Sequence, residues 1–522
     1  MDKIVKKLIN IIFALFVCWT IVLCVFFQNI NYVCKAVVSS SAIKIILGIL
    51  FFGILYLIIR VVYKYWKYKY RTYILIGVIS LVTLITQLFI LKHYYFISGW
   101  DTSFLVDLAN LVANNVNLSE LGTQPNITYF SIYPNNLFLA YIYSIIIKLH
   151  NFFNFKGNFY VTILSIQCII NVVSGVLVAL LVKKYTKKDD VAIWAECIYV
   201  LLVGLSPWNY VPYSDQMTLI FPVLILFLYS INEKNKIQLG IKWILIIFMS
   251  YIGYKIKPQV IIILIAICII QFTRFFTIWK NDKKDLLISL VSSILGFVVS
   301  FTIVMCTLKS MNIPIDKEKT YGLAHFAMMG ANTDRMGAWA GEDVEYSASF
   351  ATREERDIAD WKVFKERISE MGVYGCYMQA VRKTLTNYND GTFAWWQEGG
   401  FVAYPHKDIS NIDVKIKSVY NIEEEGGYNN NKWSNIMQCI WLTILLSLIF
   451  VPINKISCYD KQILVAMLAI LGLSLFEIIF ECRARYLYSY SPIYVILATI
   501  GICSIVEFIC LKKREKHDKK KA

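Results

Sequence analysis

Long apolar segments dominate this chain and limit the folds open to it. They recur as separate runs of roughly 17 to 24 residues, the length that crosses a bilayer as a helix. Backbone polar groups must be satisfied inside lipid, so helices are the default spanning structure. Only 17% of the residues are charged and 57% are hydrophobic, which is unlike a soluble domain. The sequence therefore predicts an all-α, polytopic membrane protein.

The formal net charge of +16 comes mostly from Lys and Arg in short loops between the apolar runs. Such loops favour the cytoplasmic side of a membrane. This distribution explains the charge better than nucleic-acid binding, so we expect no nucleic-acid partner. Most of the 13 Cys lie inside apolar runs, and no His pair has the spacing of a zinc site. We expect no cofactor, while acidic residues on the outer face leave a divalent metal ion open.

Basic segments also set the expected topology. Residues 64–71 and 183–188 are both strongly basic, so both should be cytoplasmic and an even number of crossings should separate them. Three apolar runs lie between them, and the run 134–153 is the best candidate for one that does not cross. The remaining runs predict about twelve transmembrane helices in the plasma membrane, with both termini cytoplasmic.

On this pattern the chain divides into four parts. Residues 1–72 hold two N-terminal helices, the first of them uncleaved, and 73–310 form a transmembrane core with a large outer loop, 92–158. Residues 311–433 lack the apolar pattern and predict a second extracytoplasmic region, mostly helical. A capping box at Thr352–Glu355 begins a helix there, with Ile358, Trp361, Phe364 and Ile368 on its expected buried stripe. Residues 434–522 hold the last helices and a basic cytoplasmic tail.

Asp101 follows the third apolar run, 73–91, and precedes an amphipathic stretch, 102–118. The topology places it where a helix emerges on the outer face. Asp is a preferred N-cap residue, so Asp101 can simply begin the interfacial helix. It can also act as a general base beside a hydroxyl at the water–lipid boundary. The two interpretations are compatible, because capping would hold the carboxylate in place.

Later segments bring basic residues to the same face. Lys255 and Lys257 oppose the positive-inside trend, which snorkelling or a lipid-linked phosphate would explain. Arg483 and Arg485 lie beside Glu481 at the end of an apolar run. Arg binds phosphate through paired hydrogen bonds, and a structural Glu–Arg network is the alternative.

Other polar side chains on this face are candidates for orienting a sugar or an acceptor. Asp215 follows a Ser-Pro-Trp segment and opens an inward helix, so it can cap that helix instead. His325 belongs to a stretch that matches no motif. The full set is Asp215, Glu481, Tyr486, Tyr213 and His325.

Several of these features follow one another along the chain in a characteristic order. Asp101 ends an outward helix, and an amphipathic helix and a Tyr133-Pro134 segment follow. Then come Pro-x-x-x-x-x-Tyr-x-Asp at 207–215, an outer Lys, and Glu-x-Arg-x-Arg-Tyr-x-x-x-x-x-Pro at 481–492. Over residues 73–511 this order resembles the GT-C superfamily of integral-membrane glycosyltransferases. It is most similar to glycosyltransferase family 39, which includes protein mannosyltransferases and aminoarabinose transferases.

The resemblance implies a GT-C-like bundle with two extracytoplasmic regions. It also implies inverting transfer of a sugar from a polyprenyl-phosphate donor, on the outer face of a bacterial plasma membrane. The acceptor would be a cell-wall polymer, a lipid-linked glycan or a protein. Asp101 corresponds to the family's base, and Lys255 or Lys257, with Arg483 and Arg485, corresponds to its phosphate-binding groups. The chain departs from the family in its two extra N-terminal helices and in its large region 311–433.

Two other functions stay open. A polysaccharide polymerase or ligase using diphosphate-linked glycans would also need outer Arg residues, but it would not need the acid of the first outer loop. A transporter or lipid flippase would carry charges inside several helices and show pseudo-repeats. Glu196 and Glu477 are the only charges that the pattern places inside helices, and the sequence shows no internal repeat.

Overall fold

The structure is a computed structural model that describes residues 2–27, 41–120, 125–395, 402–405, 410–420, 432–453 and 460–521. These residues are almost all helical. The two strands among them, β1 (Phe96–Ser98) and β2 (Val402–Pro405), form one small antiparallel pair. The predicted all-α class is confirmed.

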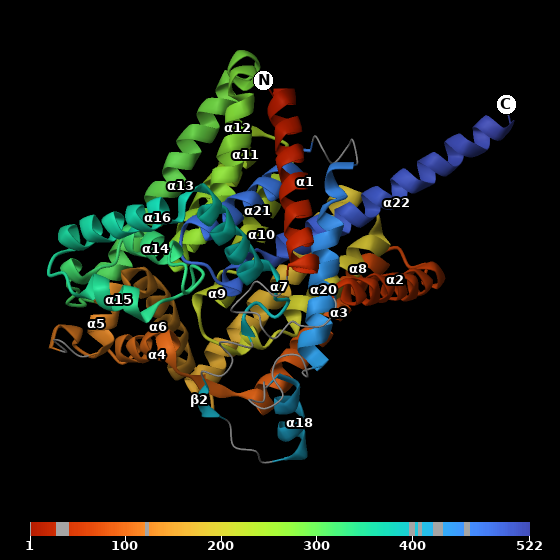
Figure 1. Cartoon of the computed structure of the whole chain (residues 1–522). Coiled ribbons are helices and arrows are strands. Elements are labelled where there is room, and N and C mark those ends of the chain that lie inside the picture. The colour runs from red at the N-terminus through yellow and green to blue at the C-terminus, as the bar shows by residue number, and fades with distance from the viewer. Residues whose placement is uncertain are drawn as a thin grey trace.

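Nine helices in the described part of the chain are long and apolar enough to cross a membrane, which confirms the polytopic prediction. Figure 1 shows α1, α11, α12 and α13 running in similar directions, with the N-terminus at the same end as the α12–α13 turn. The nine spans contain α1 (Asp2–Phe26), α2 (Ser41–Tyr65), α3 (Arg71–Tyr94), α7 (Phe159–Thr186), α11 (Lys236–Ile256), α13 (Lys283–Ser310), α20 (Lys432–Leu448), α21 (Lys461–Ile479) and α22 (Ser491–Lys521).

The other three predicted crossings coincide with shorter or interrupted helices. The run 191–207 falls on α8 (Asp189–Tyr199) and a π-helical turn, Val200–Gly204. The run 217–230 falls on α9 (Ser214–Met217) and α10 (Ile220–Ser230). The run 260–272 falls on α12 (Ile261–Asn281), whose apolar part ends at Thr273.

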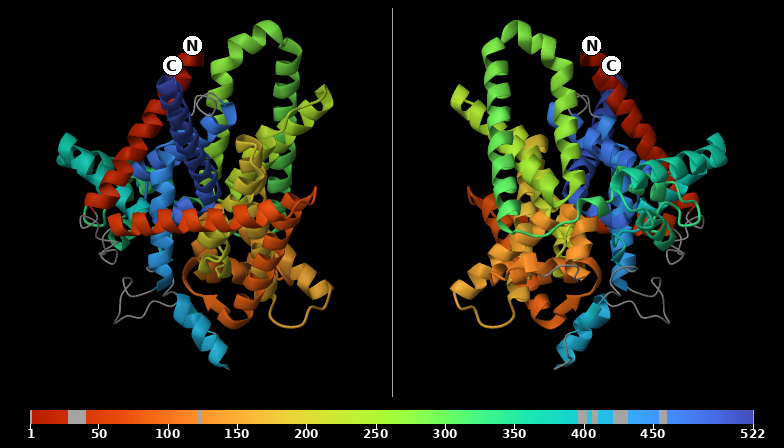
Figure 2. Two further views of the ribbon diagram at one scale, coloured as in Figure 1. Left: turned by 90° about the vertical axis from the view of Figure 1, so that its right-hand side faces the viewer. Right: turned by 90° about the vertical axis from the view of Figure 1, so that its left-hand side faces the viewer.

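The first predicted outer loop is a group of helices at the end of the molecule away from both termini (Figures 1 and 2). It contains α4 (Trp100–Ala113), α5 (Pro125–Ile132) and α6 (Leu137–Phe152), and α6 packs along α4. Leu105 and Leu108 of the predicted amphipathic stretch are fully buried. This packing fixes the position of the first turn of α4, which carries Asp101.

The predicted region 311–433 contains α14 (Leu323–Gly330), α15 (Gly341–Ala348), α16 (Arg353–Tyr388) and α18 (Asn411–Tyr420). Its stretches 396–401, 406–409 and 421–431 lie outside the described residues. The capping box is confirmed, because Thr352 and Glu355 exchange side-chain and backbone hydrogen bonds. α16 bends at Gly372, where φ is +58°.

The predicted buried stripe of α16 is wrong. Ile358 is 65% exposed, and Trp361 and Ile368 are exposed as well, while Phe364 is partly buried. The buried face instead carries Arg356 and Asp360. Arg356 donates hydrogen bonds to four backbone carbonyls, those of Glu318, Thr320, Ser347 and Phe350, which offset the burial of its charge. Asp360 accepts a hydrogen bond from Ser347 at one carboxylate oxygen. An exposed apolar face of this kind is expected of a helix at a membrane interface.

The far end of α16 enters the helix bundle. The Tyr388 hydroxyl lies 2.6 Å from the hydroxyl of Ser474 in α21 and 2.7 Å from that of Tyr494 in α22. The region 311–395 is therefore joined to the two helices that flank the Glu481–Tyr486 segment.

Candidate active site

A cavity of about 720 Å³ lies where α4, the α11–α12 link, α14 and the α21–α22 link meet. It brings together residues from several segments that carry predicted site residues. Two of the predicted site residues, Lys255 and Asp215, do not line it. Those that do are Asp101, Tyr213, Lys257, His325, Glu481, Arg483, Arg485 and Tyr486.

Asp101 lies in the first turn of α4 and is partly exposed to the cavity. The N-cap position is occupied by Gly99, so the interpretation of Asp101 as the N-cap is wrong. Trp100, between them, adopts φ +46°, a left-handed conformation that is unusual for a residue with a side chain. This backbone turn directs the chain into α4, and the carboxylate still gains from the positive end of the helix dipole.

Tyr213 connects Asp101 to the basic side of the cavity. Its hydroxyl donates a hydrogen bond of 2.9 Å to Oδ2 of Asp101. Its ring lies 4.8 Å from the Trp100 ring and 5.1 Å from the guanidinium carbon of Arg485. Burial and the charge of Asp101 raise the pKa of Tyr213 well above its usual value, so the hydroxyl stays protonated and remains a donor.

Asp215 lies behind the cavity wall as the counterion of two cations. It pairs directly with Lys257, and its Oδ2 lies 3.6 Å from Nε of Arg485. All three side chains are at most 9% exposed. One carboxylate thus faces two cations. Arg485 also contacts the face of Trp100 at 4.7 Å, and Lys257 that of Tyr486 at 4.8 Å.

The remaining predicted cations differ from this buried pair. Arg483 lies 3.9 Å from Glu481, and both line the cavity with partly exposed side chains. Lys255 lies in the last turn of α11, near the rings of Tyr251 and Tyr254, away from the cavity. The structure therefore brings Lys257, and not Lys255, to the predicted site.

His325 is fully buried in the α14 wall of the cavity. Its Nδ1 lies 2.7 Å from Oγ of Ser347, and Ser347 donates its own hydrogen to Asp360. Nδ1 must therefore carry the proton, and Nε2 presents a lone pair. Burial lowers the pKa of His325 to about 4, so the imidazole is neutral at pH 7.

Lys383 is a buried residue that the sequence analysis missed. Its ammonium donates to the carbonyls of Gly330, at 2.9 Å, and Phe480, at 2.6 Å. It thus ties α16 and α14 to the residue that precedes Glu481. The polar repeat Gln379, Lys383, Asn387, with its spacing of four, marks a buried polar face and could have indicated this contact.

Among the described residues, no three His, Cys, Asp or Glu side chains converge as metal ligands. Of the acidic groups at the cavity, Asp101 accepts a hydrogen bond from Tyr213, and Glu481 lies 3.9 Å from Arg483.

Comparison with known proteins gives structural likenesses of low similarity and a family. The archaeal oligosaccharyltransferase AglB from Archaeoglobus fulgidus, solved with an inhibitory peptide and a dolichol-phosphate, matches with a TM-score of 0.42 and 11% identity. The match covers 86% of this chain and 52% of that one, so the chain spans about half the length of AglB. No curated protein sequence matches it. The model of a family described as conserved hypothetical integral membrane proteins matches residues 1–505, and the chain belongs to that family.

Proposed function

We propose that this chain is a GT-C-like glycosyltransferase of the plasma membrane. It transfers a sugar from a polyprenyl-phosphate donor to a hydroxyl of a cell-wall polymer, a lipid-linked glycan or a protein, on the outer face. One observation carries the proposal: a single cavity presents the partly exposed carboxylate of Asp101 and, one aromatic ring away, the cations Lys257 and Arg485. Such a pairing suits a reaction that removes a proton at one point and releases a phosphate at another.

Asp101 is assigned as the general base. A carboxylate accepts several hydrogen bonds, so it can hold the Tyr213 hydroxyl and still receive a proton from an acceptor. The acceptor oxygen attacks the anomeric carbon while the bond from that carbon to the phosphate oxygen breaks. The electron pair leaves with polyprenyl phosphate, and a single displacement of this kind inverts the anomeric configuration.

Lys257, Arg483 and Arg485 are assigned to the donor phosphate. Asp215 holds Lys257 and Arg485 in place, and both cations line the cavity, where a phosphate would complement their charge. Because the pair is already buried, little reorganisation accompanies the growth of charge on the leaving group. Lys255 does not line the cavity and is not assigned this role.

The other predicted residues are assigned to orienting the substrates. Glu481, Tyr486 and His325 line the cavity and would position the sugar or the acceptor, together with Tyr213. Asp215 would act on the substrates only through its two cations.

The test is turnover by the purified protein in lipid, with labelled donors. Polyprenyl-phosphate sugars should be consumed, with release of polyprenyl phosphate, and an Arg485→Ala variant should lose most of this activity. Turnover of diphosphate-linked glycans alone would favour the polymerase or ligase. Movement of intact lipid-linked sugar across the bilayer, without cleavage, would favour a flippase.

A further inference from the structure

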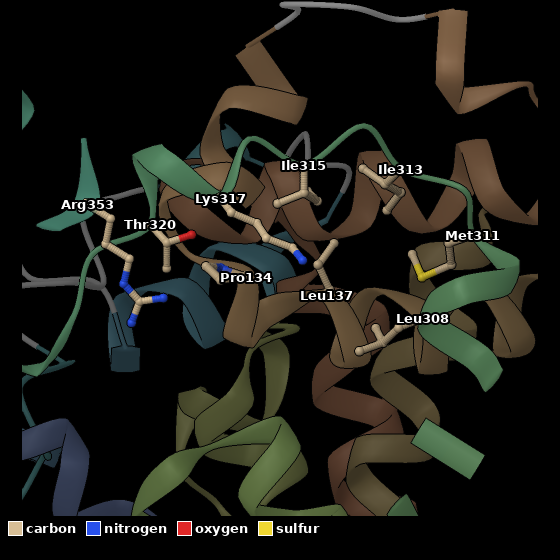
Figure 3. Close-up of a pocket in the computed structure, with 9 residues that line it drawn as sticks. All are labelled: Pro134, Leu137, Leu308, Met311, Ile313, Ile315, Lys317, Thr320 and Arg353. Atoms are coloured by element: carbon tan, nitrogen blue, oxygen red, sulfur yellow. The ribbon is translucent and has the colours of Figure 1, made fainter. Parts of the chain in front are cut away.

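A second cavity, an apolar groove of about 340 Å³, lies between the beginning of α6 and the segment that follows α13 (Figure 3). It is lined along most of its length by Leu137, Leu308, Met311, Ile313 and Ile315. Met311 and Leu137 are buried, and the two isoleucines are partly exposed. A groove of this composition suits a hydrocarbon chain better than a polar ligand.

The groove begins where the lipid-facing surface of α13 ends. Ile294, Val298 and Met305 of α13 are 64%, 50% and 49% exposed, as expected of side chains that face a bilayer. Leu308 lies one turn beyond Met305 and is the first groove residue in this direction. A chain inserted in the outer leaflet could therefore reach the groove along this apolar face of α13.

Two cationic side chains, those of Lys317 and Arg353, line the other part of the groove. Figure 3 shows the Lys317 ammonium extending toward Leu137, and Arg353 at the end away from Leu308 and Met311. Both side chains are exposed, and Arg353 shares a loose contact of 3.7 Å with Asp357. An apolar groove with cations at one end is suited to bind an anionic amphiphile.

The groove joins the larger cavity on the side of the proposed base. Pro134 and Arg353 line both. The neighbouring Tyr133 lines the larger cavity, and the negative charge of Asp101, together with burial, raises the pKa of Tyr133. Because Tyr133 lies next to Pro134, an amphiphile in the groove would bring its head group to the part of the larger cavity that holds Asp101.

We propose that the groove holds the hydrocarbon chain of an anionic, hydroxyl-bearing lipid of the outer leaflet, and that this lipid is the acceptor. The proposal rests on the proposed function and narrows its acceptor to an amphiphile. The lipid hydroxyl oxygen forms the new bond to the anomeric carbon, and its proton passes to Asp101. The bond from the anomeric carbon to the donor phosphate breaks, and its electron pair leaves on polyprenyl phosphate.

The test uses phosphatidylglycerol with a photoactivatable acyl chain, because this lipid is anionic and has free head-group hydroxyls. The full-length protein in lipid nanodiscs should be labelled between residues 308 and 320, and more strongly than by the matching phosphatidylcholine. Ile315→Trp fills the groove and should reduce the labelling severalfold. Ile303→Trp, on the exposed side of α13, is the matched control and should leave it unchanged. Lys317→Gln, at an exposed position that should tolerate the change, should reduce the preference for the anionic lipid.

Three results would overturn the proposal: no labelling in this segment, equal labelling of wild type and Ile315→Trp, or displacement of the label by polyprenyl phosphate. The last would assign the groove to the donor. The readout does not require turnover, so it separates the two proposals. The protein could cleave no polyprenyl-phosphate sugar and still be labelled in a way that Ile315→Trp reduces. That result would contradict the proposed reaction but support the lipid site.

Discussion

The hydroxyl of Tyr213 donates a hydrogen bond of 2.9 Å to Oδ2 of Asp101. This bond joins the segment before α9 to the first turn of α4, two parts of the chain that are 112 residues apart. The Tyr213 ring also contacts Arg485. The orientation of the proposed base and that of the proposed phosphate ligand therefore depend on one side chain.

Tyr213→Phe removes this hydrogen bond and keeps the ring. One hydrogen bond to a charged group contributes about 1.5–3 kcal/mol, so we expect the rate of transfer to fall roughly tenfold to a hundredfold. The donor KM should change little, because the contact of the ring with Arg485 is kept. Steady-state kinetics of the purified variant measure both values, and a rise in donor KM at constant kcat would contradict this role.

Lys257→Met should abolish transfer and destabilise the protein, because the buried carboxylate of Asp215 loses one of its two cationic partners. Removing one partner of a buried pair costs about 3–5 kcal/mol. The double variant Asp215→Asn with Lys257→Met should regain most of the stability but no activity. Lys255→Met, two residues away and outside the cavity, is the matched control and should retain both. Recovery of transfer in the double variant would show that Lys257 has only a structural role.

Asp360 predicts a measurable pH dependence of stability. Burial raises its pKa to about 6 in the folded chain, against about 3.9 when unfolded. The folded state therefore favours the protonated carboxyl, and this stabilisation is complete below about pH 4 and is lost as the pH rises through 6.

Asp360→Asn cannot ionise and so cannot lose this stabilisation. The melting temperature of the wild type, relative to Asp360→Asn, should fall by a few degrees between pH 4 and 6 and stay constant above. His325, whose pKa is lowered to about 4, contributes with the opposite slope and is present in both proteins. A difference that does not vary with pH would contradict the raised pKa of Asp360.

Lys383→Met should lower the melting temperature by several degrees. It leaves the carbonyls of Gly330 and Phe480 without their buried donor, at about 1–3 kcal/mol for each group. Lys362→Met, on the exposed side of the same helix, breaks only a 3.9 Å surface pair with Glu366 and should have almost no effect. Equal melting temperatures for the two variants would show that the Lys383 contacts do not stabilise this junction.

The sequence predicted the helices of this protein well, because run length and loop charge report directly on a bilayer. It also predicted the capping box at Thr352, and it pointed to the segments that meet at the cavity. These features depend on local sequence, and each can be recognised without knowing its partners.

The contacts among those segments could not be predicted from the sequence. In a membrane protein apolar side chains face lipid as well as core, so the stripe at Ile358 and Trp361 of α16 did not reveal which face is buried. The pairing of Asp215 with Lys257 joins residues 42 positions apart, and no local pattern predicts it. The groove at Ile313 and Ile315 depends likewise on how α6 meets the end of α13.

Asp101→Asn, compared with Asp107→Asn, tests the central claim most directly. Both substitutions are isosteric and lie on α4, but Asp107 is exposed and does not line the cavity. A general base contributes about a hundredfold to ten-thousandfold to the rate. We predict that Asp101→Asn lowers the transfer of sugar from polyprenyl phosphate by that factor while its melting temperature stays close to that of the wild type, and that Asp107→Asn transfers normally. Transfer by Asp101→Asn at the wild-type rate would contradict the account.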